Sequence, residues 1–115
     1  MQYLLLIYHN EAEWAALSDM EKEAIYKEYR SLTEELVSSG TYKAGQELLP
    51  TSAATTVRVR NGKVSVTDGP FAETKEQLGG FFLVEAEGLD EAMAIAARIP
   101  SARDGSIEVR PIASS

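Results

Sequence analysis

The chain contains no cysteine and only one histidine, His9. The lack of cysteine excludes disulfide bonds and thiol catalysis. With a single histidine, a transition-metal site would have to rely on carboxylates. We therefore expect no metal site and no other cofactor.

Long apolar runs and basic residues are also scarce. The opening MQYLLLIYHN has a short apolar run without a cationic lead, which argues against a signal peptide. No segment approaches the ~20 apolar residues of a membrane helix. The chain has 11 Lys and Arg against 18 Asp and Glu, and its net charge of −7 repels phosphate backbones. We expect a cytoplasmic protein that binds neither membranes nor nucleic acid.

What is present is a regular pattern of strands and helices, which fits a single domain over residues 1–115. Predicted strands cover 2–8, 41–49, 80–87 and 105–112, predicted helices cover about 19–39 and 89–100, and a predicted hairpin covers 55–69. Ser18 with Glu21 forms a capping box at the first helix, and Asp90 is the expected N-cap of the second. Asn61-Gly62 favours a type I′ turn in the hairpin.

The order β-α-β, hairpin, β-α-β predicts a ferredoxin-like α+β fold, in which two helices cover one face of an antiparallel sheet. The strands at 2–8 and 81–86 are apolar on both faces. Two helices can cover only one of those faces, and a second copy of the chain is the simplest cover for the other. We therefore expect a face-to-face homodimer.

Residues 67–82, TDGPFAETKEQLGGFF, form the most unusual segment. About thirteen residues would separate the hairpin from a strand that starts near Phe81, and loops of this length are often functional. A structural alternative is that residues 71–78 form a turn or two of helix, entered through a rigid DGP turn at 68–70. The sequence leaves both interpretations open.

The segment DGPFAETKEQLGGF resembles the signature of the DGPF subgroup of the YCII-related family. YLLLIY near the start, TTVRVRNGKVSVTDGPF in the middle and SIEVRP near the end also fit the family pattern, so the resemblance covers nearly the whole chain. It implies a dimeric α+β barrel, in agreement with the two-faced strands. It also implies an association with sigma factors of the extracytoplasmic-function type, beside which bacterial members often occur.

Some members of the wider YCII family resemble lyases that act on small unsaturated acids through a His–Asp pair. The His lies on the first helix, and the Asp precedes a proline after the second helix. This sequence departs from that pattern, because Glu28 or Tyr29 stands at the first position and Ile99 precedes Pro100 at the second. The resemblance therefore does not carry that catalytic pair to this chain.

Asp68 and His9 are the candidate catalytic residues. The family motif begins at Asp68, and a carboxylate on a Gly-Pro turn can be held rigidly enough to act as a base or to orient one. Histidine changes charge near neutral pH, which suits an acid/base partner. The structural alternatives are that Asp68 only stabilises the turn and that His9 is a strand-end residue without a role.

The candidate ligand-binding residues are Phe71, Glu73, Lys75 and Arg110. Arg110 could hold a carboxylate bidentately, or it could form a salt bridge to Asp68 or Glu73. Lys75 could attract an anion, although Glu73 and Lys75 also fit a solvated surface. Phe71 is expected to be a buried anchor. Trp14, expected on the loop before the first helix, is either a lid on the core or a platform for substrate.

These residues favour a small-molecule-binding protein with its site between sheet and helices, near Asp68 and His9. If the protein is an enzyme, we expect cofactor-independent, lyase-like proton transfer or elimination on a small carboxylic or oxo acid. The alternative is a non-catalytic dimeric regulatory module that works with a sigma factor. A cofactor-free oxygenase is supported by analogy of fold alone.

Overall fold

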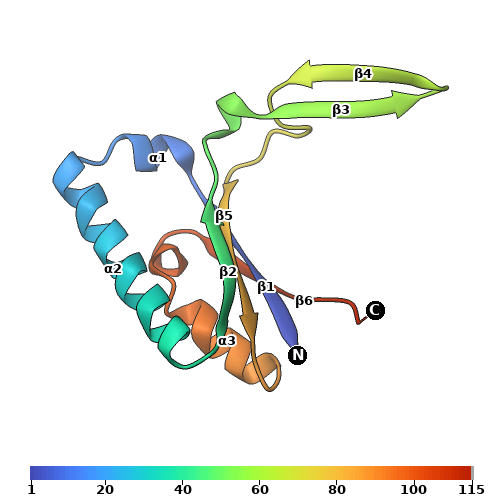
Figure 1. The fold of residues 1–115 in the computed structure, drawn as a ribbon. Coiled ribbons are helices and arrows are strands. Elements are labelled where there is room, and N and C mark those ends of the chain that lie inside the picture. The colour runs from blue at the N-terminus through green and yellow to red at the C-terminus, as the bar shows by residue number, and fades with distance from the viewer. Residues whose placement is uncertain (115) are drawn as a thin grey trace.

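The computed structural model describes residues 1–114. The elements in chain order are β1 (Gln2–His9), α1 (Glu11–Ala15), α2 (Asp19–Ser38), β2 (Tyr42–Glu47), β3 (Thr55–Arg60), β4 (Lys63–Asp68), β5 (Gln77–Glu85), α3 (Leu89–Ala97) and β6 (Ser106–Pro111), with 3₁₀ turns at Thr51–Ala53 and Pro100–Arg103 (Figure 1). Among the described residues, no helix combines the length and the hydrophobicity needed to cross a bilayer.

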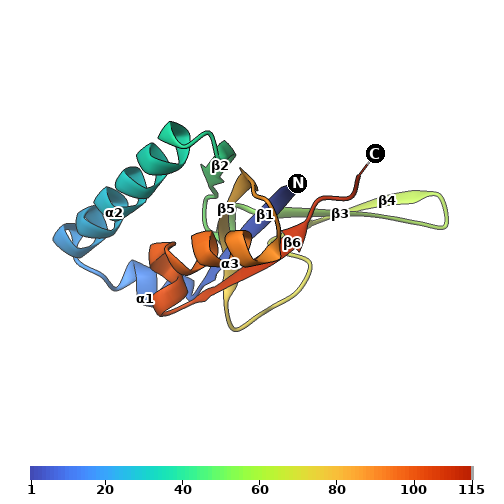
Figure 2. The same ribbon diagram turned by 90° about the horizontal axis from the view of Figure 1, so that it is seen from below.

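The main sheet has the order β2-β5-β1-β6, and every neighbouring pair is antiparallel. Each outer strand is connected to a central one through a helix, and α2 and α3 pack on the same face (Figures 1 and 2). The predicted ferredoxin-like α+β fold is confirmed. The predicted capping box is also present, since the Ser18 hydroxyl accepts from the Glu21 N–H and the Glu21 carboxylate accepts from the Ser18 N–H.

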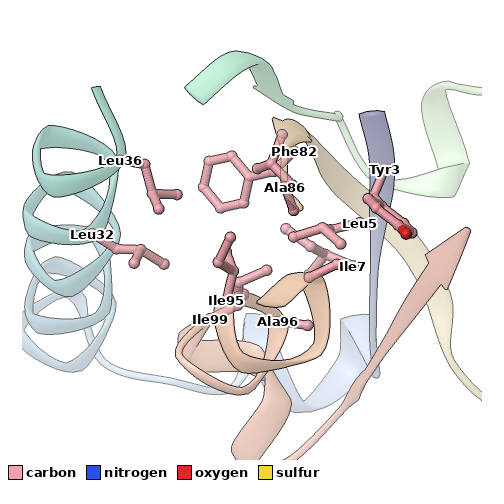
Figure 3. Packing of buried hydrophobic residues seen from close by; sticks show 12 residues of the cluster. Tyr3, Leu5, Ile7, Leu32, Leu36, Phe82, Ala86, Ile95, Ala96 and Ile99 are labelled. Carbon is pink, nitrogen blue, oxygen red and sulfur yellow. The ribbon is translucent and has the colours of Figure 1, made fainter. Parts of the chain in front are cut away.

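The hydrophobic core lies between the sheet and these two helices (Figure 3). Alternate residues of β1 and β5 point into it and meet leucines of α2 and isoleucines in and after α3. Its members include Tyr3, Leu5, Ile7, Leu32, Leu36, Phe82, Val84, Ile95 and Ile99. Leu5, Val84 and Ile99 are its largest fully buried side chains. The period-two alternation of the strands therefore fixes which face the helices cover.

The opposite face of the sheet carries no helix of the described chain (Figure 2). Its centre is apolar, and the β6 residues opposite Leu4 and Leu6 are Arg110 and Glu108. The β1–β5 register places Leu4 opposite Leu83 and Leu6 opposite Phe81. These side chains and Tyr8 are half-buried, in contrast to their inward-facing neighbours. We call the surface formed by Leu4, Leu6, Tyr8, Phe81 and Leu83 the open face. The prediction that both faces of these strands are apolar is confirmed, and a single chain covers only one.

The predicted hairpin forms a separate two-stranded sheet of β3 and β4, which we call the arm. Asn61 and Gly62 have φ angles of 51° and 74°, the left-handed values that a type I′ turn requires. The arm projects from the body on the side opposite α2 (Figures 1 and 2). One of its faces carries Val57, Val59, Val64 and Val66, which are 58–68% exposed.

Three local expectations are wrong. Strand β5 begins at Gln77, so the segment that connects it to the arm spans only 69–76 and contains no helix. Gly88, with extended backbone, is the N-cap of α3, and Asp90 lies within its first turn. Trp14 belongs to the short helix α1 rather than to a loop. In each case the local sequence is compatible with more than one backbone conformation, and contacts with distant parts of the chain determine which one forms.

Candidate functional site

A cavity of about 290 Å³ lies between α2 and the part of the sheet formed by β1, β5 and β2. Its wall is rich in aromatic side chains and includes a few polar groups, a combination typical of small-molecule sites. We call it the aromatic cavity. The residues that shape it are His9, Trp14, Tyr26, Tyr29, Tyr42, Gly45, Glu47, Gly79, Gly80, Phe81, Phe82 and Ser101, with Ile7, Thr33 and Gln46 completing the wall.

Helix α1 places Trp14 at one end of the aromatic cavity. The Glu11 N–H donates to the Gln77 side-chain oxygen (3.0 Å), which ties α1 to the start of β5. The Glu11 carboxylate accepts from the backbone N–H and the hydroxyl of Thr51 (2.7 and 2.8 Å). Anchored in this way, Trp14 packs edge-to-face on Tyr26 of α2, with ring centroids 5.5 Å apart.

Glycines of β2 and β5 create the space for the aromatic rings. The β1–β5 register shifts between Ile7 and Tyr8, so Gly79 is an extra residue in β5. A Cβ on Gly79 would lie 2.6 Å from Nε2 of His9, and a Cβ on Gly45 would lie 2.7 Å from Cδ1 of Phe82. Bulges often occur beside functional sites, where they redirect a side chain. Gly79 therefore accommodates the His9 ring, whereas Gly80 permits the close approach of the Gln46 carbonyl of β2, which would lie 2.8 Å from a Cβ.

The aromatic cavity contains one of the two candidate catalytic residues. His9 ends β1 and lines the cavity, with its ring centroid 6.1 Å from that of Trp14. Asp68 ends β4 on the arm, pairs with Thr55 across the hairpin and is exposed. Asp68 is not part of the cavity wall. The structure thus places His9 between sheet and helices, and it places Asp68 outside.

The candidate ligand-binding residues also lie outside the aromatic cavity. Phe71 is 78% exposed, so the expectation of a buried anchor is wrong. Glu73 and Lys75 are exposed in the 69–76 segment. Arg110 is exposed on β6 and forms an ion pair with Glu108, not with Asp68 or Glu73. The DGPF segment instead supports the base of the arm, because Thr56 donates to the Gly69 carbonyl (2.8 Å) and Arg58 to the Phe71 carbonyl (3.4 Å).

Several polar residues of the cavity were not predicted as functional. The Tyr26 hydroxyl donates to the Glu47 carboxylate (2.8 Å), and the hydroxyls of Tyr29 and Ser101 are hydrogen-bonded at 2.7 Å. Tyr26 and Tyr29 are three residues apart on α2, a spacing that puts both on one side of the helix. That spacing could have identified the pair. Their partners come from β2 and from the turn after α3, and only the tertiary fold brings them there.

The electrostatic environment of the cavity keeps both phenols neutral. Burial raises the pKa of Tyr26 to about 12, and the hydrogen bond and negative charge of Glu47 act in the same direction. Burial also raises the pKa of Tyr29, against the opposing effect of its hydrogen bond with Ser101. The charges of Asp104 and Glu47 further raise the pKa of Tyr29. Negative potential therefore extends over this end of α2.

A tyrosinate titration tests this environment. Tyr26 should hold its proton up to about pH 12 in the folded chain, whereas an unperturbed tyrosine loses it near 10. Between these pH values the unfolded state binds fewer protons, so the contribution of Tyr26 to the free energy of unfolding is present below pH 10 and is lost toward pH 12. The absorbance difference between wild type and Tyr26→Phe should titrate near pH 12. A midpoint near 10 would contradict the assignment.

Within residues 1–114, no group of three or more His, Asp or Glu side chains is arranged to hold a metal ion. The polar groups of the cavity are an imidazole, an indole N–H, a carboxylate, a carboxamide, phenols and aliphatic hydroxyls. This set can hydrogen-bond an organic molecule. His9 and Glu47 can also exchange protons with it.

The fold and the cavity define a class, a ferredoxin-like α+β protein with an aromatic small-molecule site beside its sheet. The chain belongs to the YCII-related domain family, whose model matches residues 1–114. It is 41% identical over 115 residues to "Uncharacterized protein R00369" of Rhizobium meliloti (strain 1021), and the match covers 98% of this chain and 93% of that protein. Membership of the family, expected from the sequence motifs, is confirmed.

Proposed function

We propose that this protein, as a member of the DGPF subgroup, binds a small organic molecule in the aromatic cavity. The observation that carries the proposal is the cavity itself, about 290 Å³ in volume, where an imidazole and a carboxylate face a largely aromatic wall. Gly45 and Gly79 line this space, and a Cβ on either would press into a ring of the wall, that of Phe82 or that of His9. A core that needed only stability would fill such a space, because proteins pack their interiors closely.

The chemistry that these groups support is cofactor-independent proton transfer. His9 is the acid/base group in the wall, and Glu47 is the carboxylate that shares the cavity with it. We assign the second acid/base role to Glu47 rather than to Asp68, because Asp68 lies on the arm. Elimination on a small oxo or carboxylic acid is one reaction of this type, but the anion-holding candidates Lys75 and Arg110 are not in the wall.

The single tryptophan of the chain, Trp14, lies in the cavity wall and provides the test. A panel of small neutral, anionic and cationic organic molecules should include ligands that change its fluorescence in a saturable manner. Gly79→Ala should weaken the best of them at least tenfold, because the new methyl group displaces the His9 ring. Gly88→Ala is the matched control, because its Cβ would meet nothing within 4 Å.

The competing hypothesis is a non-catalytic regulatory module that works with an extracytoplasmic-function sigma factor. Such a module needs no polar cavity, so the presence of one favours the small-molecule proposal. If no member of the panel changed Trp14 fluorescence while the circular dichroism spectrum showed an intact fold, the small-molecule proposal would fail. A sigma factor that bound to the purified protein would then support the regulatory module.

We also propose that the protein is a homodimer that packs through the open face. A single chain has an accessible surface of 7923 Å², against about 6,200 Å² for a compact monomer of its mass. Its radius of gyration is 16.1 Å, whereas about 13 Å is typical of a compact chain of this length. The excess of roughly 1,700 Å² is ample for a stable interface, which buries about 800 Å² per partner.

The arm supports the same proposal. Isolated two-stranded hairpins are marginally stable in water, yet the arm exposes the valine face of such a hairpin. It projects on the side opposite α2, which is the side where a second copy on the open face would lie (Figures 1 and 2). The arm, residues 55–68, contains three bases and one acid in a chain of net charge −7, so it is attracted to the acidic body of another copy.

A further inference from the structure

We propose that the ligand of the aromatic cavity is a small organic cation, an amine or ammonium group on a compact apolar body. This inference rests on the proposed function, namely that the cavity binds a small molecule at all. It concerns the charge of that molecule. The observations that carry it are the charges, hydrogen bonds and rings of the cavity wall.

The wall contains the Glu47 carboxylate and, apart from the His9 imidazole, no basic side chain. Glu47 is an exposed residue of β2 that lines the cavity, whereas the wall includes neither lysine nor arginine. The whole chain is also acidic, with a net charge of −7. An anionic ligand would meet an unpaired carboxylate in the wall, and a cationic ligand would neutralise it.

The phenol groups of the cavity are not free to compensate for a negative ligand. The Tyr26 proton is donated to Glu47, and the Tyr29 hydroxyl is bonded to that of Ser101. A bound carboxylate would have to break these hydrogen bonds to find donors. The charges of Glu47 and Asp104 also reach Tyr29, where they act against a further negative charge. The side-chain donors that remain for an anion are those of His9, Trp14 and Gln46, and none of them is a lysine or an arginine.

The aromatic rings of the wall suit a cation. Trp14 and Tyr26 meet edge-to-face, as do Tyr42 and Phe82 with centroids 6.0 Å apart, so the rings around the cavity differ in orientation. The faces of such rings attract ammonium groups. Lys22 shows this attraction within the chain, since its Nζ lies 5.9 Å from the centroid of Trp14. Lys22 itself is not in the wall of the cavity.

The nearest arginine does not change this balance. Arg103 lines a smaller neighbouring cavity that shares His9, Trp14 and Ser101 with the aromatic cavity. Its guanidinium is paired with Glu28 at 2.7 Å, and the same neighbouring cavity is also lined by Glu13 and Asp104. The surroundings of the site are thus acidic on this side as well.

The test uses three probes with one body and three charges: benzylamine, benzyl alcohol and benzoate. Each is titrated at neutral pH against the full chain, with Trp14 fluorescence and isothermal calorimetry as readouts. We expect benzylamine to bind at least tenfold more tightly than benzyl alcohol, and benzoate to bind most weakly. Glu47→Gln should weaken benzylamine about tenfold and leave benzyl alcohol within twofold, because it removes only the charge.

Glu34→Gln is the matched control, since Glu34 is an exposed carboxylate of α2 outside the cavity wall. It should leave the affinities for all three probes unchanged. Equal affinities for benzylamine and benzyl alcohol, or tighter binding of benzoate, would overturn the inference while the cavity remained a small-molecule site. If none of the three probes bound, and if a wider panel of small molecules also gave no response, the proposed function itself would be overturned.

Discussion

Leu83→Glu should convert the proposed dimer, twice the 12.6 kDa of one chain, into a monomer. Leu83 lies on the open face opposite Leu4, on the sheet surface that α2 and α3 leave uncovered. Placing a carboxylate there would bury an unpaired charge from each copy in the interface, at a cost of several kcal/mol per charge. Since each 1.4 kcal/mol is a factor of ten, the dissociation constant should rise on the order of a thousandfold or more.

Sedimentation equilibrium over a wide range of protein concentrations measures this change. Met20→Glu is the matched control, because it introduces the same charge at a side chain of α2 that is already 83% exposed. A wild-type chain that sedimented as a monomer at all concentrations would contradict the proposed dimer. A dimer that persisted in Leu83→Glu would place the interface elsewhere, and substitution of Val59 on the arm would then be the next test.

The parts of the fold that could be predicted from the sequence are those with local causes. The capping box fixes the start of α2 through two hydrogen bonds made three residues apart. Asn61-Gly62 fixes the turn of the arm because both residues tolerate positive φ. The alternation of β1 identifies its two apolar faces. From these elements and their order, the ferredoxin-like arrangement follows with few alternatives.

The site was harder to predict because its contacts are long-range. Glu47 lies within the predicted strand 41–49 with no local sign of a role, and its hydrogen bond to Tyr26 depends on how β2 packs against α2. His9 pairs with Gln77 along the strands, and its ring lies against Gly79, the extra residue at the bulge in the β1–β5 register. Asp68 is the opposite case, because the sequence indicated it as a site residue. It starts the most unusual motif but belongs to the projecting arm. An unusual motif marks a segment whose residues are required for some purpose. Here at least one purpose is to support the base of the arm.

Truncation of one core side chain should lower the free energy of unfolding by several kcal/mol. This loss is comparable to the cost of placing a charge in the proposed interface. Leu5 lies in the middle of β1, is 0% exposed and packs in the cluster with Val84 and Ile99. Leu5→Ala removes buried methyl groups and leaves a cavity that neighbouring strands and helices fill only partly. The expected loss in the free energy of unfolding is therefore about 2–5 kcal/mol.

Urea unfolding at one fixed protein concentration measures the effect of Leu5→Ala, since the stability of a dimer depends on concentration. Met20→Ala, at an 83% exposed side chain, should change the stability by no more than about 0.5 kcal/mol. Leu5 is two residues from Ile7, whose side chain forms part of both the core and the cavity wall. If Leu5→Ala lowered the free energy of unfolding by less than Met20→Ala does, α2 and α3 would not be packed on this face of β1. The placement of Ile7 in the wall of the aromatic cavity would then be wrong as well.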